Sequence, residues 1–295
     1  MKKIITHDGR FHTDEIFAVA VVQLFLDGES EKYEVIRTRD NEIIKTGDFI
    51  VDVGGEYDAS RNMFDHHQIG GAGTRENDMP YAAFGLVWKQ FGESLCKSPE
   101  VADRIDRKLV QYVDAADVGI DVYEPIFDHL NIYTVGTLFR SYMPTWKEDD
   151  LDADNAFAEV VDIAKRVLQR EIIVTTDELD GECKMEEAYR SAKDKRIVVI
   201  DKYYSGKGAL RKYNEPLFVV GPRKDGGWVI SAIRDNENTF DSRKDLPESW
   251  AGKKGKELAD ITGVEDAMFC HNARFLAGAG SREGAIRLAK IAADA

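Results

Sequence analysis

Short apolar runs and helical patterns are interspersed along the first 120 residues, and this arrangement constrains the fold more than any other feature. The strand-like runs are 3–5, 33–38, 49–53 and 62–64. The helical patterns are 14–28, 81–91 and 99–114. Strands that alternate with helices form a mostly parallel sheet, because a parallel neighbour is reached through a crossover. The sequence therefore predicts an α/β fold for this part of the chain.

A chain of 295 residues is long enough for two domains. Apolar residues recur at helical spacing after position 153, which predicts a long helix. Strand-like runs at 197–200, 217–220 and 228–233 then precede two helical patterns, at 253–262 and 281–293. We expect an N-terminal domain over 1–150, a helical linker over 151–194 and a smaller α/β domain over 195–295.

The formal charge of −14 is concentrated in the N-terminal half. Residues 1–150 contain 16 Lys and Arg against 28 Asp and Glu, whereas residues 151–295 contain 24 against 26. Phosphate contacts depend on clustered Lys and Arg, so this composition is poor for general nucleic-acid binding. The carboxylate excess in the first half instead suits the binding of cations.

Cysteine usage and hydrophobicity indicate a cytoplasmic protein. Cys96, Cys183 and Cys270 lie far apart with no CxxC pair, which argues against disulfides and against a thiolate zinc site. No signal-peptide apolar region follows Met1. The longest apolar stretch, 16–26, is too short to span a bilayer.

Histidines and aspartates gather where three of the predicted strands end. His7, His12 and Asp14 share one loop, Asp52 ends a second strand and His66 follows a third. Open α/β sheets bind ligands at the carboxyl ends of their strands, where these five side chains would meet. Imidazole and carboxylate together suit a borderline divalent metal, and one carboxylate could bridge two cations. Each residue alone would more often cap a helix or fill a turn, but their convergence favours a metal site.

Three ordered motifs resemble a known family. His-Asp-Gly-x-Phe-His-x-Asp-Glu at 7–15 is followed by Val-Asp-Val-Gly-Gly-x-Tyr-Asp at 51–58 and Phe-Asp-His-His-Gln at 64–68. This series is similar to the melanocyte-proliferating-gene (MYG) exonuclease family of the DHH phosphoesterase superfamily. Stretches 84–89, 113–117, 243–247 and 281–285 also resemble it, so the resemblance spans nearly the whole chain. It implies a DHH-type catalytic domain with the active site in the cleft between the two domains.

The resemblance also implies two metal ions. His7, His12 and Asp52 would hold one ion, and Asp14, Asp52, His66 and an aspartate near 114 would hold the other. Superfamily relatives commonly have aspartate where this chain has His12. Asp114 and Asp117 lie three residues apart on one helical face. We favour Asp114 as the ligand, and Asp117 is either the alternative metal ligand or a supporting or capping residue. Nitrogen and oxygen ligands without thiolate fit Mn²⁺ best, with Mg²⁺, Co²⁺ or Zn²⁺ as alternatives.

Two further groups of side chains are candidates for catalysis and substrate binding. His67 could contact the phosphate or protonate the leaving oxygen, and Asp65 would orient a histidine. In the second domain, glycines before the last helix could let backbone amides approach an anion, and the alternative is a turn capped by Ser281. The resemblance favours substrate binding there, by His271, Arg274 and Arg282, with Arg243 as a weaker candidate.

These observations predict a divalent-metal-dependent phosphodiester hydrolase. The resemblance implies a 3′–5′ exoribonuclease acting on single-stranded RNA, alone or as a homodimer, without a membrane partner. One alternative is a small-molecule phosphoesterase acting on an oligonucleotide, a nucleotide or pyrophosphate. A metal-stabilised binding protein without turnover is the other.

Overall fold

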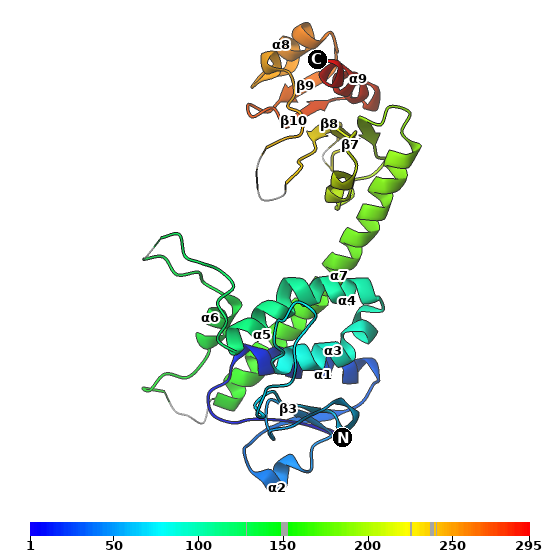
Figure 1. Cartoon of the computed structure of the whole chain (residues 1–295). Coiled ribbons are helices and arrows are strands. Elements are labelled where there is room, and N and C mark those ends of the chain that lie inside the picture. Colours follow the sequence, from blue (N-terminus) through cyan, green and yellow to red (C-terminus); the bar gives the residue numbers. More distant parts are fainter. Residues whose placement is uncertain (128, 149–152, 225, 237–238, 240) are drawn as a thin grey trace. The chain divides into compact units, whose positions relative to one another are not determined.

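A computed structural model describes residues 1–127, 129–148, 153–224, 226–236, 239 and 241–295. The chain divides into two compact units, Met1–Thr175 and Thr176–Ala295. Each unit contains helices and one five-stranded sheet, so the predicted α/β class is confirmed (Figure 1). The border between the units falls within the long helix α7 (Ala153–Ser191), in the stretch where the sequence predicts a helical linker.

The sheet of unit 1 is mostly parallel, as predicted. Its strand order is β2 (Tyr33–Arg37), β1 (Lys2–Thr6), β3 (Phe49–Val51), β5 (Met63–Phe64) and β4 (Tyr57–Asp58). β1 pairs in parallel with β2 and β3, β3 pairs in parallel with β5, and only β4 is antiparallel. Because β1, β3 and β5 are parallel neighbours, their carboxyl ends lie at one edge of the sheet.

Helices α1 (Thr13–Gly28) and α3 (Ala83–Cys96) pack against each other beside this sheet. α1 is buried almost all round, as its sequence predicts. The rings of Phe17 on α1 and Phe84 on α3 stack with their centroids 4.9 Å apart. A separate apolar cluster joins Ile5 and Ile50 to Ile44, the last residue of α2 (Asn41–Ile44). Burial on both sides of the strands holds their carboxyl ends in place.

The remaining helices of unit 1 complete the surroundings of that edge. The predicted helix 99–114 is continuous but contains a π-helical turn, η2 (Asp106–Val110), between α4 (Pro99–Ile105) and α5 (Gln111–Asp117). The extra residue of a π turn changes which side chains of the following helix share a face. A short 3₁₀ turn, η1 (Ala59–Arg61), joins β4 to β5, and α6 (Val135–Arg140) precedes α7.

Unit 2 is a mixed sheet with helical cover. The order is β6 (Ile197–Val199), β7 (Phe218–Pro222), β8 (Trp228–Ala232), β10 (Leu276–Ala279) and β9 (Ala267–Cys270), and only β6 and β7 are parallel. α9 (Arg282–Asp294) packs on the sheet, and α8 (Gly255–Thr262) contacts β9. Two 3₁₀ turns, η4 (Lys207–Lys212) and η5 (Glu248–Trp250), lie in the connections.

The sequence pattern identifies β6, β7 and β8 but not β9 and β10. β10 reads Leu-Ala-Gly-Ala, and alanine and glycine are depleted in strands. None of the helices in the described ranges is long and apolar enough to cross a membrane.

Candidate metal centre

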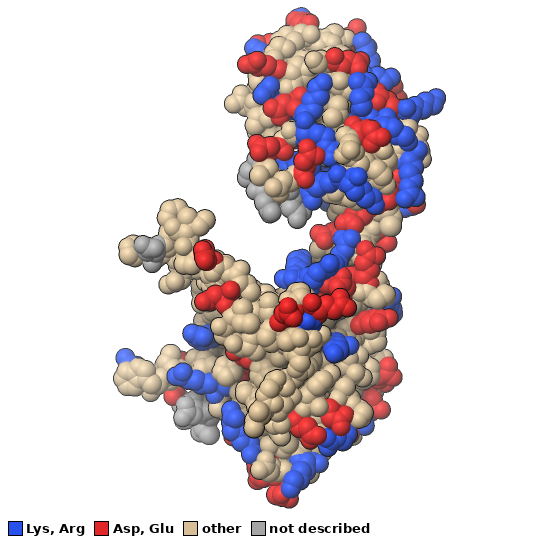
Figure 2. Space-filling view, viewed as in Figure 1, with Lys and Arg blue, Asp and Glu red and all other residues tan. Residues whose placement is uncertain are grey.

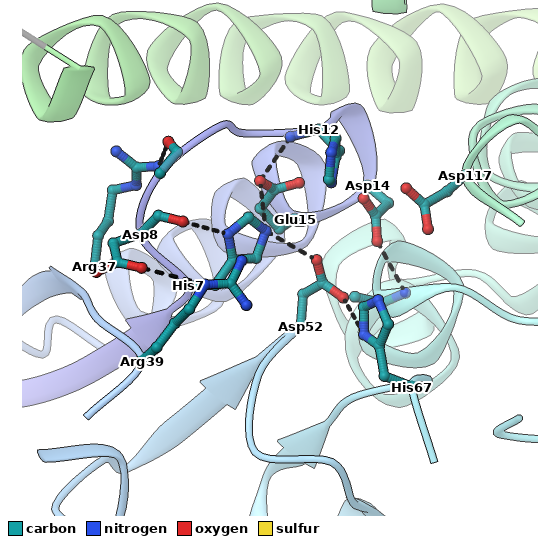
Figure 3. Close-up of polar contacts among 12 residues, drawn as sticks. His7, Asp8, His12, Asp14, Glu15, Arg37, Arg39, Asp52, His67 and Asp117 are labelled. Carbon is teal, nitrogen blue, oxygen red and sulfur yellow. Dashed lines mark hydrogen bonds and ion pairs between the residues drawn. The ribbon is translucent and has the colours of Figure 1, made fainter. Parts of the chain in front are cut away.

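The loop between β1 and α1 places His7 deep in the sheet edge. His7 follows the last residue of β1 and is 2% exposed. Its Nδ1 lies 2.9 Å from the carbonyl oxygen of Asp8, and its Nε2 lies 3.1 Å from Oε1 of Glu15 (Figure 3). The same Nε2 lies 3.3 Å from Oδ2 of Asp52. Ligand atoms of His7, His12, Glu15 and Asp52 all lie within 4.8 Å of one another.

Asp52 directly follows β3, at a sharp turn of the backbone. Its φ is +55°, a left-handed conformation that aspartate tolerates better than most residues, and its amide donates to the carbonyl oxygen of Phe64 at 3.0 Å. Its Oδ1 lies 3.6 Å from Nε2 of His66 and 3.4 Å from Nδ1 of His67. The Asp52 carboxylate therefore faces His7, after β1, with Oδ2. It faces His66 and His67, after β5, with Oδ1.

A third group joins the start of α1 to the end of α5. Ligand atoms of His12, Asp14 and Asp117 lie within 4.8 Å of one another. Asp117 is also linked to the second group, because its Oδ2 lies 3.3 Å from Nε2 of His66. Asp52 and His12 each belong to two groups, so the three groups form one continuous cluster at the carboxyl ends of β1, β3 and β5.

The ligand types of the cluster, and its buried oxygens without hydrogen bonds, fit divalent cations. Oδ1 of Asp14, Oε2 of Glu15 and Oδ1 of Asp52 are buried and, among the described residues, accept no hydrogen bond. Buried carboxylate oxygens are costly unless a charge or a donor compensates them. Burial raises the pKa of Asp14 well above its usual value, and the nearby carboxylates of Asp52 and Asp117 raise it further. Two positive ions would remove that repulsion, and imidazole and carboxylate are suitable ligands.

The raised pKa of His7 in the metal-free protein also indicates a site for a cation. Burial lowers the pKa of His7, but hydrogen bonds with Asp52 and Glu15 outweigh it and raise the pKa to about 10. The site thus stabilises a positive charge at the ring nitrogen that faces the cluster. A metal ion would replace that proton.

Asp65 orients His67 by two contacts. Its Oδ1 lies 2.8 Å from Nδ1 of His67 and accepts the His67 backbone N–H at 3.0 Å. Oδ2 accepts the N–H of Gly55 at 2.6 Å. Although burial alone would raise the pKa of Asp65, these hydrogen bonds lower it, so the carboxylate stays ionised. The His67 side chain is 62% exposed, so its orientation is fixed while its edge remains accessible.

Asp114 and Asp117 have different surroundings. Asp114 is fully buried, accepts the N–H of Gly85 at 2.9 Å and lies 2.8 Å from Nη2 of Arg75, a charge contact rather than a directed hydrogen bond. Burial raises the pKa of Asp114 to about 7 against the opposing effect of Arg75. The structure places Asp117, and not the favoured Asp114, against His66. Which of the two binds metal stays a prediction.

Glu15 is the residue of the cluster that sequence reasoning missed. It is fully buried, and its Oε1 accepts the backbone N–H of His12 at 2.7 Å as well as facing His7. The spacing of His12 and Glu15 is that of a helix-capping pair, in which the third residue of the helix reaches back to the residue before it. A glutamate three residues after a loop histidine is therefore the sequence feature that could have identified Glu15.

Arg243, one of the predicted substrate contacts, is fully engaged within unit 2. Its Nη1 donates to the carbonyl oxygens of Tyr213 at 2.7 Å and Pro216 at 2.8 Å, and its Nε donates to Asp235 at 2.7 Å. These bonds join the segment before β7 to the segment after β8. Its substrate role stays a prediction without support from this geometry.

The glycine-rich segment before α9 already faces an anionic group of the protein. Asp266 accepts the N–H of Ser281 at 2.6 Å, and Ser281 caps α9 by accepting the N–H of Gly284 at 3.0 Å. Arg282 lies over the ring of Trp228, 5.9 Å from its centre. Arg274 pairs with Asp245 at 2.9 Å, and the exposed His271 packs against Phe275. Substrate binding by His271, Arg274 and Arg282 remains untested.

Comparison with known proteins identifies the family. The family model MYG1_exonuc, described as Uncharacterised protein family (UPF0160), matches residues 3–293. The chain belongs to this family. The resemblance inferred from the three motifs is thereby confirmed.

The relatives of this MYG1-family chain match it almost from end to end. The human protein named MYG1 exonuclease is 30% identical over 322 residues, which cover 98% of this chain and 85% of the relative. The MYG1 protein of Schizosaccharomyces pombe is 28% identical, over 99% of this chain and 97% of the relative. A solved structure of RecJ with Mn²⁺ from Thermus thermophilus gives a TM-score of 0.28 at 12% identity, over 100% of this chain and 52% of RecJ. So low a TM-score does not establish a shared arrangement.

Proposed function

We propose that this protein is a divalent-metal-dependent hydrolase of phosphodiester bonds. The observation that carries the proposal is the buried cluster at the carboxyl ends of β1, β3 and β5, in which Asp52 faces His7 with one oxygen and His66 with the other. The names of the relatives, which include MYG1 exonuclease, give the same activity class.

Two cations are proposed, with Mn²⁺ the best fit to the donor set and Mg²⁺, Co²⁺ or Zn²⁺ as alternatives. His7, His12, Glu15 and Asp52 would hold one ion, and Asp14, Asp52, His66 and Asp117 would hold the other. When bound, two such ions make a water molecule more acidic and offset the charge that develops on a phosphate. Asp114 instead supports the fold through Arg75 and Gly85.

The chain's own residues supply proton transfer and orientation. Asp65 holds Nδ1 of His67, which fixes the ring so that its other nitrogen can meet the substrate. When it carries two protons, His67 can contact a phosphate oxygen or give a proton to the leaving oxygen. His67 is thus the proposed proton donor, and Asp65 is its positioning residue.

The proposed substrate is single-stranded RNA, shortened from its 3′ end by a cytoplasmic enzyme. The sequence resemblance supports this choice, whereas the net charge of −14 gives no independent support for RNA. On the face that Figure 2 shows, Lys and Arg side chains are interspersed with Asp and Glu in both units and are more frequent over unit 2. The alternatives are a small phosphoester substrate and binding without turnover. A homodimer and an active site between the two domains remain predictions.

The discriminating experiment incubates purified protein and Mn²⁺ with RNA or DNA labelled at either end, with a dinucleotide and with pyrophosphate. Asp52→Ala should abolish turnover. Asp103→Ala is the matched control, because Asp103 is an exposed aspartate on α4 that pairs with Arg107. Stepwise shortening of RNA carrying a 5′ label supports the 3′–5′ exonuclease. Cleavage of the small substrates alone supports the phosphoesterase, and bound metal without any turnover contradicts both.

A further inference from the structure

A cavity of about 540 Å³ in unit 1 includes two of the candidate ligands in its wall. His12 and Asp117 line it, together with residues of the β1–α1 loop, α5, α6 and the segment that follows α6. All of its lining residues belong to unit 1, so its composition does not depend on where unit 2 lies. Cavities of about 300–1,000 Å³ typically hold small molecules.

Two arginines in this cavity have no charged partner within the described residues. Arg10 and Arg140 both line it, and both are exposed. Within the described part of the chain, neither guanidinium forms a hydrogen bond or an ion pair. Most arginines elsewhere in unit 1 are paired, as Arg37 is with Asp154 and Arg75 with Asp106. In a unit with a large excess of carboxylates, two guanidinium groups beside a metal cluster that have no partner among the described residues indicate an anionic ligand.

The backbone that carries both arginines is anchored. Arg10 lies between His7 and His12, and Arg37 holds that loop by donating to the carbonyl oxygen of Gly9 at 2.7 Å. Arg140 directly follows Phe139, which is 1% exposed and packs against Phe17 of α1 with the ring centres 5.6 Å apart. The backbone at both arginines is therefore held by contacts, while their guanidinium groups have no partner among the described residues.

The close packing of α6 explains why Arg140 can lie beside the cluster. A Cβ atom at Gly136 would lie 3.0 Å from Oγ1 of Thr13, the first residue of α1. Glycine thus allows the backbone of α6 to approach the helix that begins beside the metal centre. Half-buried Met143 and Pro144, just after α6, add an apolar wall to the cavity.

We propose that this cavity binds a nucleotide of the substrate next to the bond that is cleaved, with its phosphate on Arg10 and Arg140. A nucleotide combines the anionic group that the arginines require with an apolar face that suits Met143 and Pro144. Arginine is well suited to phosphate because its planar group can make two parallel hydrogen bonds. The inference rests on the proposed phosphodiesterase activity and deepens it by naming residues for substrate positioning.

The test compares dinucleotides that differ by one phosphate. ApA has only the phosphate to be cleaved, whereas pApA and ApAp each add a second phosphate on one side of it. Wild type should cleave one of the two phosphorylated forms with a KM about tenfold below that of ApA. In Arg10→Ala and Arg140→Ala that preference should fall to about twofold or less. Equal KM values for all three in wild type, or an unchanged preference in both variants, would overturn the proposal.

Two matched variants separate a specific contact from a loss of charge. Arg170→Ala removes another exposed arginine of unit 1, on α7 and outside the cavity, and should keep the wild-type preference. Arg140→Lys keeps the charge but loses the planar fork, so it should restore part of the preference that Arg140→Ala loses. An Arg170→Ala effect as large as that of Arg140→Ala would show a general charge effect and contradict the assignment.

A binding measurement distinguishes failure of this inference from failure of the proposed function. AMP and inorganic phosphate are titrated calorimetrically into Mn²⁺-loaded protein. AMP should bind more tightly than phosphate, and its affinity should fall about tenfold in Arg140→Ala with metal content unchanged. If no dinucleotide is cleaved but AMP binding still depends on Arg140, the activity is wrong and the cavity stands. If dinucleotides are cleaved and AMP binding ignores both arginines, the cavity is wrong and the activity stands.

Discussion

Nε2 of His7 lies 3.3 Å from Oδ2 of Asp52, although the two residues follow different strands, β1 and β3. The parallel pairing of these strands produces the contact, because it brings their carboxyl ends to the same edge. The second oxygen of Asp52 faces His66 and His67, so this carboxylate links the two halves of the cluster. Figure 3 shows Asp52 between His7 and His67. Asp14 and Glu15 in the first turn of α1 and Asp117 at the end of α5 then add carboxylates to the cluster.

Metal affinity should rise with pH, because His7 must lose a proton to act as a ligand. Although burial lowers the pKa of His7, Asp52 and Glu15 raise it to about 10 in the metal-free protein. Between about pH 6 and pH 9 we expect tighter Mn²⁺ binding with release of protons. Calorimetry in buffers of different ionisation enthalpy measures that release. Affinity independent of pH over this range would show that His7 is not a ligand.

The stability of the metal-free protein should change with pH in the opposite sense. The folded-state pKa of His7, about 10, is above its ordinary value of 6.5, so its protonated form stabilises the fold. That contribution is complete below about pH 6.5 and is lost as the pH rises through about 10. Melting temperatures measured with a chelator should fall over this window. His7→Gln should give a shallower decline, and an identical slope would contradict the assigned pKa.

Asp114→Asn and Asp117→Asn should have separable effects. Asp114→Asn should lower the free energy of unfolding by about 1–3 kcal/mol, because its charge contact with Arg75 is buried, while metal binding persists. Asp117→Asn should weaken metal binding with little loss of stability, because its side chain is 17% exposed. Urea denaturation and metal titration measure both. The reverse pattern would return the ligand role to Asp114.

Glu15→Gln should lower Mn²⁺ affinity by at least about tenfold. Glutamine can still accept the N–H of His12, so the helix start is preserved while the charge is lost. Helicity by circular dichroism serves as the control. Unchanged metal affinity would reduce Glu15 to a helix-capping residue.

Gly85→Ala should destabilise the fold by about 1–3 kcal/mol. Its Cβ would lie 1.9 Å from Oδ2 and 2.8 Å from Cγ of Asp114, which is fully buried, so one of the two residues would have to shift. Gly28→Ala, at the end of α1 with nothing within 4 Å, is the matched control and should change stability by less than about 1 kcal/mol. Equal effects in the two variants would mean that Asp114 does not occupy this position.

The sequence predicted that residues at three strand ends would meet if those strands were neighbours in the sheet. His7, Asp52 and His66 each follow a short apolar run, and strands alternating with helices imply parallel neighbours. The structure supplies the adjacency of β1, β3 and β5, which the sequence pattern did not reveal, and this adjacency brings the residues together. The prediction needed no knowledge of side-chain conformations, because the topology alone determines the shared edge.

Features that depend on helix phase and on distant contacts could not be predicted. Asp114 and Asp117 lie on the same face of a regular helix, so their spacing does not show which one faces the cluster. The π-helical turn η2 just before α5 alters which side chains do so. The partners of Arg243 are backbone carbonyls of Tyr213 and Pro216, and no local pattern reveals them. The carboxylate of Asp266 before α9 comes from a similarly remote loop.

The most direct test of the central claim is a count of Mn²⁺ ions per chain by mass spectrometry, in wild type and in Asp52→Asn, after dialysis at pH 8. The account predicts about two ions in wild type. It predicts fewer than one in Asp52→Asn, because each carboxylate oxygen serves a different group of ligands. Wild-type protein that retains no metal, or an Asp52→Asn variant that retains both ions, would contradict it.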